Sequence, residues 1–122
     1  MAKVLFVNNR GGRSWTNLLR QAVLNLGGTL TLLDQQEVKD NACVGFDLII
    51  LDAGVVNDLA LIIRTIRSSN PLARIVVVSP TPHWKQARET LLVGGSDYVR
   101  KADDEAALLG FLQDSLSKVP SA

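Results

Sequence analysis

The stretches Asp47-Leu48-Ile49-Ile50-Leu51-Asp52 and Arg74-Ile75-Val76-Val77-Val78-Ser79 decide the fold. Each stretch has an uninterrupted apolar interior and ends in a polar side chain. Strands with this character are buried on both faces, which is typical of the centre of a parallel sheet. We therefore expect both stretches to be central strands, with Asp52 and Ser79 at their carboxyl ends.

Further apolar runs and helical patterns extend outward from these two stretches. The strand-like runs cover residues 3–8, 29–33, 47–52, 74–79 and 97–100. Helical spacing of apolar residues joins one run to the next, weakly over residues 36–43 and clearly elsewhere. This alternation predicts an α/β fold with a single five-stranded parallel sheet and helices on both faces. A flavodoxin-like (βα)5 fold would have the strand order 2-1-3-4-5, although periodicity alone does not give the order.

Polar residues and glycine suggest where the helices begin and end. We expect Ser14 to cap the first helix and Gly27 to end it. Asn57 is the candidate cap of the third helix, and Thr81 followed by Pro82 is the candidate start of the fourth. The fifth helix is expected to open with the acidic run 103–105, which suits the positive end of a helix dipole.

Composition limits the classes of protein. The 122 residues with 47% hydrophobic content suit one domain, expected over residues 1–118, with 119–122 as a tail or the start of a linker. A net charge of +1 favours neither nucleic acid nor an anionic membrane as partner. No apolar run approaches the roughly 20 residues of a membrane span, so we expect a cytoplasmic protein. One cysteine and one histidine rule out an internal disulfide and a Cys/His zinc cluster, and Cys43 is either a small core side chain or a reactive thiol.

Three polar side chains follow the ends of three predicted strands. Asp52, Ser79 and Lys101 supply a carboxylate, a hydroxyl and an ammonium. In a parallel sheet they meet at the carboxyl edge, where open α/β sheets bind ligands. This combination suits phosphoryl transfer, in which a nucleophile is needed together with compensation for charge on the phosphoryl oxygens. The alternative is an ordinary ion pair between Asp52 and Lys101.

The chain resembles a receiver domain of two-component response regulators, the CheY-like family, over nearly its whole length. The resemblance depends on the runs 47–52, 76–79 and 95–101, which contain Asp52, Ser79 and Lys101 in order. Tyr98 and Lys101 follow Ser79 by 19 and 22 residues, as they do in the family pattern. None of these runs is specific alone, but the ordered set at these spacings is.

The resemblance implies roles for individual residues. Asp52 would accept a phosphoryl group from a sensor histidine kinase or a phosphotransfer protein, while Ser79 and Lys101 contact its oxygens. Tyr98 would form a conformational switch with Ser79, although it is equally an ordinary half-buried strand aromatic. Mg²⁺ would be held by Asp52, Asn9 and the backbone carbonyl of Gly54. Such a domain is a signalling module rather than an enzyme.

The chain departs from the family pattern where an acidic pair helps to hold Mg²⁺. Asn8 and Asn9 occupy those positions, and amides bring no charge to an ion that is usually bound by carboxylates. We therefore expect Mg²⁺ to be a possible but weakly bound cofactor, with Arg10 or Arg13 as alternative sources of positive charge. Lys101 is followed by Ala102 rather than proline, which argues against a cis peptide bond there.

The sequence is also compatible with two other classes of function. One is a phosphorylation-independent pseudo-receiver that docks or forms a homodimer through the face running from the fourth to the fifth helix. On that face Trp84 is either an exposed anchor for a partner or a side chain packed on its own helix, and His83 is expected to be solvated rather than catalytic. The other class is a small α/β enzyme or nucleotide binder. The glycine pairs 11–12 and 27–28 do not favour this class, because they match no phosphate-binding motif.

Overall fold

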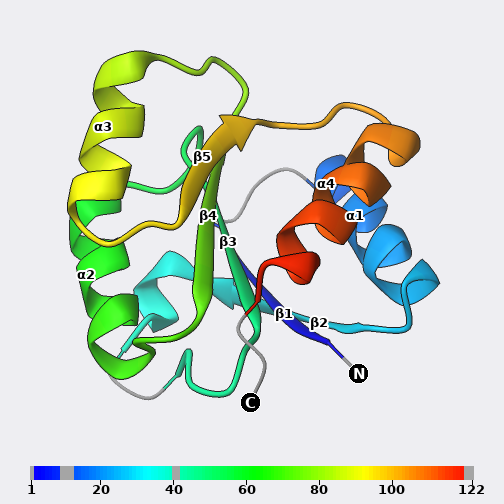
Figure 1. Ribbon diagram of the computed structural model, residues 1–122, viewed down its shortest axis with the longest axis horizontal. Coiled ribbons are helices and arrows are strands. Elements are labelled where there is room, and N and C mark those ends of the chain that lie inside the picture. Colours follow the sequence, from blue (N-terminus) through cyan, green and yellow to red (C-terminus); the bar gives the residue numbers. More distant parts are fainter. Residues whose placement is uncertain (1, 9–12, 40–41, 120–122) are drawn as a thin grey trace.

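The computed structural model describes residues 2–8, 13–39 and 42–119 (Figure 1). Its strands are β1 (Lys3–Asn8), β2 (Thr29–Asp34), β3 (Leu48–Asp52), β4 (Arg74–Ser79) and β5 (Asp97–Arg100). Its helices are α1 (Arg13–Asn25), α2 (Leu59–Ser69), α3 (Trp84–Leu92) and α4 (Glu105–Ser117), with a short 3-10 helix η1 (Gln35–Glu37). Within the described residues, no helix has both the length and the apolar character that crossing a membrane requires.

The five strands form one parallel sheet with the order β2-β1-β3-β4-β5. This confirms the predicted fold class and the order expected of a flavodoxin-like fold. The register pairs Asp52 with Val78 and Ser79 with Arg100. The carboxyl ends of β3, β4 and β5 therefore lie side by side.

Helices cover both faces of the sheet, with α1 and α4 on one side and α2 and α3 on the other (Figure 1). Successive strand residues alternate between the two apolar layers, as a period of two requires. The strand residues facing α1 and α4 are Val4, Phe6, Leu48, Ile50, Val76 and Val78. Those facing α2 are Leu5, Val7, Ile49, Leu51, Ile75 and Val77. Because β3 and β4 are covered twice, their apolar residues are almost completely buried, as the uninterrupted runs predicted.

The predicted second helix over residues 36–43 is wrong. Within this range the structure describes residues 36–39 and 42–43, and none of these lies in an α-helix. The 3-10 helix η1 begins with a capping box between Asp34 and Glu37 and ends at an extended Val38. Farther along, Gly45 has a φ of +91°, which turns the chain back toward β3. Cys43 is buried in the apolar layer between the sheet and α2, so it is the small core side chain that was one of the two expectations for it.

Three of the predicted helix starts are also wrong. Ser14 lies inside the first turn of α1. Asn57 is tied to Gln35 by two hydrogen bonds, and Asp58 precedes α2 without a side-chain cap. The amide of Thr81 donates to Ser79 Oγ, so α3 begins later, with His83 as its cap.

The two predictions about helix ends at Gly27 and the acidic run are confirmed. Gly27, with a φ of +75°, lies two residues beyond Asn25, the last residue of α1, and its amide donates to the Leu24 carbonyl at 3.0 Å. The side chain of Asp104 accepts a hydrogen bond of 2.8 Å from the Ala107 amide and caps α4. Glycine and acidic residues therefore marked these ends correctly because the local backbone requires them.

Arg67 holds together the turns at the amino end of the sheet. Its guanidinium donates to the carbonyls of Gly94, Asn70 and Ala73, over distances of 2.6–3.0 Å. Burial lowers the pKa of Arg67, since removing the guanidinium from water disfavours its charge. The carbonyl partners compensate for part of this cost, and this cluster fixes where β4 and β5 begin.

Candidate functional site

The candidate site lies at the carboxyl edge of the sheet and is centred on Asp52. Asp52 is the last residue of β3 and is only 2% exposed. Its Oδ2 accepts a hydrogen bond of 2.6 Å from Lys101 Nζ, and its Oδ1 accepts one of 2.8 Å from the Gly54 amide. Each carboxylate oxygen therefore accepts a hydrogen bond, as a buried polar group requires.

Lys101 reaches Asp52 from the segment that follows β5. Its backbone amide donates to the Ser79 carbonyl at 2.8 Å, so the pairing with β4 continues beyond the end of β5. The side chain of Lys101 is 18% exposed and that of Asp52 is 3% exposed. Asp52 and Lys101 thus form a largely buried ion pair. Both interpretations of the sequence, a phosphoryl-transfer site and an ordinary structural ion pair, expect this contact.

Ser79 is brought to the same edge as the last residue of β4. It is 3% exposed, and it lies one residue beyond Val78, the partner of Asp52 in the sheet. Its Oγ accepts a hydrogen bond of 3.2 Å from the Thr81 amide, which orients the hydroxyl at the start of the following turn. All three of the strand-end residues singled out in the sequence therefore converge.

Gly54 contributes its backbone to the site. A Cβ at this position would lie 3.2 Å from Asp52 Oδ1 and 3.2 Å from the ring of Pro80, a tighter distance than side chains ordinarily tolerate. The amide of Gly54 can approach the carboxylate because no side chain intervenes. The role of the Gly54 carbonyl as a ligand of Mg²⁺ stays a prediction.

The described donor set fits Mg²⁺ poorly. No group of three or more His, Cys, Asp or Glu side chains that could share a metal occurs among residues 2–8, 13–39 and 42–119. Asp52 already contacts an ammonium and an amide, whereas Mg²⁺ requires oxygen ligands in nearly octahedral geometry. Asn8 is half-buried at the end of β1. Asn9, Arg10 and the side chain of Arg13 lie outside what the structure describes.

Trp15 also belongs to this site, although its helical spacing with Leu19 and Ala22 marks it only as a residue on the apolar face of the first helix. Lys101 Nζ lies 4.7 Å from the centroid of its ring, and its indole Nε1–H donates to the Ala102 carbonyl at 2.8 Å. No spacing rule connects these residues, because they are far apart in the chain. The described residues contain no cis peptide bond, in agreement with the expectation from Ala102.

Tyr98 is half-buried on the edge strand β5. Its hydroxyl donates to Gln86 Oε1 at 2.6 Å and accepts from the His83 amide at 3.4 Å. These contacts join β5 to the start of α3. The switching role of Tyr98 stays a prediction, and its hydroxyl is the group that would have to leave α3 if the ring moved.

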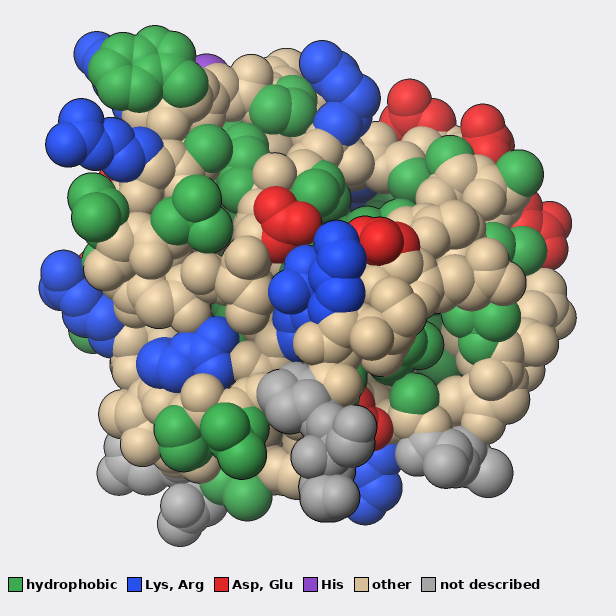
Figure 2. All heavy atoms as spheres, viewed as in Figure 1, with side chains coloured by type: hydrophobic (Ala, Val, Ile, Leu, Met, Phe, Trp, Pro, Cys, Tyr) green, Lys and Arg blue, Asp and Glu red, His purple; other side chains and the backbone are tan. Residues whose placement is uncertain are grey.

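The start of α3 carries the exposed residues His83 and Trp84. His83 Nδ1 accepts from the Gln86 amide at 3.3 Å, so its structural role is that of a helix cap. Trp84 is 68% exposed, so most of its surface faces solvent. Apolar side chains, with Lys and Arg among them, lie on the surface over α2 and α3 (Figure 2).

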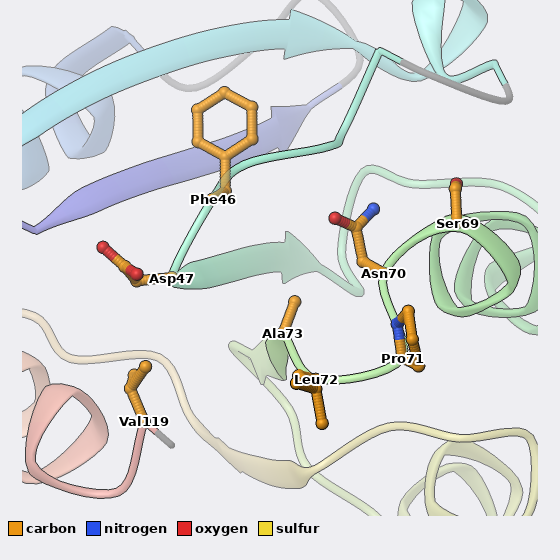
Figure 3. A pocket seen from close by; sticks show the side chains of 8 residues that line it. All are labelled: Phe46, Asp47, Ser69, Asn70, Pro71, Leu72, Ala73 and Val119. Atoms are coloured by element: carbon orange, nitrogen blue, oxygen red, sulfur yellow. The ribbon is translucent and has the colours of Figure 1, made fainter. Parts of the chain in front are cut away.

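A separate cavity of about 260 Å³ lies at the opposite, amino end of the sheet (Figure 3). It is lined by residues that precede β3, by the last residue of α2 and the segment that joins α2 to β4, and by one residue after α4. These are Phe46, Asp47, Ser69, Asn70, Pro71, Leu72, Ala73 and Val119. Asp47 is its one ionisable lining residue, and that carboxylate accepts a hydrogen bond of 2.8 Å from the Lys3 amide. The cavity therefore lacks the combination of charged groups found around Asp52.

Comparison with known proteins gives similar structures but no similar sequences. No protein-family model matches the chain, and no curated protein matches it in sequence. A two-component response regulator from Clostridium difficile has a similar structure, with 20% identity and a TM-score of 0.81 over 99% of this chain and 100% of that one. The chemotaxis response regulator CheY4 of Vibrio cholerae is similar over 95% of this chain and 99% of its own, with 24% identity and a TM-score of 0.79.

A third similar structure is the beryllofluoride-activated receiver domain dimer of NtrC4, with 18% identity and a TM-score of 0.80 over 98% of this chain and 100% of that one. At these identities the similarity shows the fold. The chain has the fold of response-regulator receiver domains over nearly its whole length, which confirms the fold that the resemblance implied.

Proposed function

We propose that this chain acts as a receiver domain in two-component signalling and accepts a phosphoryl group at Asp52. The buried Asp52–Lys101 pair, with Ser79 on the neighbouring strand end, is the observation that carries the proposal. The donor would be a sensor histidine kinase or a phosphotransfer protein. An ordinary structural ion pair needs no hydroxyl at this edge, whereas a phosphoryl group needs donors for its oxygens.

The proposed reaction transfers one phosphoryl group without any redox change. An oxygen of Asp52 attacks phosphorus, and a P–O bond forms as the P–N bond to the donor imidazole breaks. The bonding electron pair returns to the imidazole nitrogen, and the product is an aspartyl phosphate. Lys101 then has phosphoryl oxygens within reach as charge-assisted partners, and Ser79 can donate its hydroxyl proton to one of them.

Weak binding of Mg²⁺ is part of the proposal. The formal charges of Asp52 and Lys101 cancel, and the described residues contain no group of three or more His, Cys, Asp or Glu side chains that could share a metal ion. A divalent ion would approach the Lys101 ammonium without the usual excess of negative charge. We expect poor Mg²⁺ affinity and slow phosphorylation. A calorimetric titration that detects sub-millimolar Mg²⁺ binding, absent in Asp52→Ala, would contradict this expectation.

The intact mass of the protein after incubation with acetyl phosphate tests the proposed function. Wild type should gain one phosphoryl group, with acetate as the leaving group, and Asp52→Ala should gain none. Asp47→Ala is a matched control, because Asp47 lies at the opposite end of β3 and should not affect labelling. A folded wild-type protein that gains no phosphoryl group from acetyl phosphate or from phosphorylated kinases would refute the proposal.

The second candidate is a docking or dimerisation module that works without phosphorylation. Asn8 at the end of β1 and the complete pairing of Asp52 favour it, since both describe a site that is stable with no ligand. The partner surface would include the face from α3 to α4, and a homodimer is the simplest assembly. Sedimentation of wild type and Asp52→Ala separates the candidates, because this module would assemble equally well with either chain.

A further inference from the structure

Lys101 is held by two side chains that differ in chemistry. Its Nζ donates to Asp52 Oδ2 at 2.6 Å and lies 4.7 Å from the ring centroid of Trp15. We propose that Trp15 is a positioning residue that keeps the Lys101 ammonium at the Asp52 carboxylate. This inference deepens the proposed function and depends on it only for its kinetic consequence.

The ring of Trp15 is itself fixed in place. Trp15 is 9% exposed in the first turn of α1, and its ring meets Phe6 edge-on with a centroid distance of 5.1 Å and an interplanar angle of 60°. Its Nε1–H donates to the Ala102 carbonyl, one residue beyond Lys101. The indole therefore has a defined position relative to both the backbone and the ammonium of Lys101.

The backbone of Lys101 is fixed at its other side by β4. The Lys101 amide donates to the Ser79 carbonyl, while the Ala102 carbonyl accepts from Trp15. Between these anchors only the four-carbon side chain of Lys101 can move. A lysine with this freedom loses rotamer entropy when it is held, and a flat ring beneath the ammonium reduces the number of positions that it can adopt.

An aromatic ring attracts the ammonium without supplying a negative charge. The attraction comes from the ring quadrupole, so it does not depend on the charge of Asp52. When a phosphoryl group arrives and the carboxylate becomes an acyl phosphate, the interaction with Trp15 persists. Trp15 can thus keep Lys101 in the site through a reaction that changes its other partner.

The chain offers a matched control in its second tryptophan. Lys85 Nζ lies 5.7 Å from the ring centroid of Trp84, but Trp84 is 68% exposed. Water competes with such a contact, and Lys85 has no described partner in the Asp52 site. Replacing Trp84 therefore removes an indole–lysine contact of the same kind from a place where it positions nothing for phosphoryl transfer.

The kinetic test is the initial rate of labelling of the full chain by acetyl phosphate, followed by intact mass. Trp15→Leu should label about tenfold more slowly, within the range that cation–π contacts support. Trp15→Phe keeps a ring but loses the bond to Ala102, and it should be about threefold slower. Trp84→Leu should label at the wild-type rate. Circular dichroism and urea unfolding check that each variant is folded.

A second readout does not depend on phosphorylation. Protons held over an aromatic face resonate upfield, so the ε-methylene signal of Lys101 should be displaced in a ¹H–¹³C spectrum of wild type. Lys101→Arg assigns that signal by its loss. The displacement should disappear in Trp15→Leu, decrease in Trp15→Phe and persist in Trp84→Leu.

The two readouts separate failure of this inference from failure of the proposed function. If wild type labels and folded Trp15→Leu labels equally fast, the inference is wrong while the proposed function stands. If wild type never labels, the proposed function fails and the spectrum alone decides, with an unchanged Lys101 signal in the Trp15 variants overturning the inference. If Trp15→Leu does not fold, Trp15→Phe decides in the same way, since a wild-type rate and signal would refute positioning by the indole.

Discussion

Replacing Lys101 with methionine should destabilise the fold, because it leaves the Asp52 carboxylate buried without its charged partner. Among the described residues, the Gly54 amide would still donate a hydrogen bond to this carboxylate. Methionine keeps most of the aliphatic length of lysine but removes its charge, and with it the contact between Lys101 Nζ and the Trp15 ring. The experiment therefore isolates the charge.

The geometry sets the size of the effect. Charges 2.6 Å apart attract by about 6 kcal/mol at an effective dielectric constant near 20. Part of this attraction offsets the cost of removing both groups from water, and Lys101 is near enough to the surface for water to enter. We therefore expect a loss of about 3 kcal/mol in the free energy of unfolding, the lower end for removal of one partner from a buried pair. For a domain of this size the fall in Tm is about 10 °C.

Urea unfolding followed by circular dichroism measures this loss at neutral pH. Lys118→Met is the control, since Lys118 pairs with Asp114 at 3.1 Å while their side chains are 51% and 60% exposed. An exposed pair of this kind contributes about 0.5 kcal/mol or less. The difference in lost unfolding free energy between Lys101→Met and Lys118→Met therefore reports the effect of burial, since both variants break an ion pair.

The double variant Asp52→Asn with Lys101→Met completes the argument. It removes the buried charge together with its partner, so most of the lost stability should return. The reasoning is refuted if Lys101→Met costs less than about 1 kcal/mol, or if the double variant is as unstable as Lys101→Met alone.

Three further predictions concern other parts of the fold. Gly95→Ala should cost about 2 kcal/mol in unfolding free energy, because its Cβ would lie 2.6 Å from Thr90 Cγ2 and 2.8 Å from the Thr90 carbonyl oxygen. Cys43 should resist iodoacetamide at pH 8 until the chain unfolds, since burial raises the pKa of the thiol and the reactive thiolate is scarce below that pKa. Tyr98→Phe should cost about 1 kcal/mol and speed amide exchange at the start of α3, because its hydroxyl bond to Gln86 is lost.

The sequence was a good guide to elements whose pattern is local. The apolar runs of β3 and β4 gave their positions to within one residue, and Gly27 and Asp104 gave correct helix ends. Helix starts were poorly predicted because distant contacts help to set the backbone before a helix. The backbone amide and carbonyl of Asn57 bond to the Gln35 side chain across 22 residues, a partner that no local pattern reveals.

By itself, the sequence determined that this is a parallel α/β domain with a carboxylate, a hydroxyl and an ammonium at one edge. Strand ends of a parallel sheet converge whatever the details of packing, so spacing was sufficient for Asp52, Ser79 and Lys101. Only the tertiary structure brought Trp15 to the site. Its indole bonds to Ala102 across 87 residues, and that contact exists because α1 and the segment before α4 pack on the same face of the sheet. Periodicity marks a side chain as buried, but it does not say which distant charge that side chain will face.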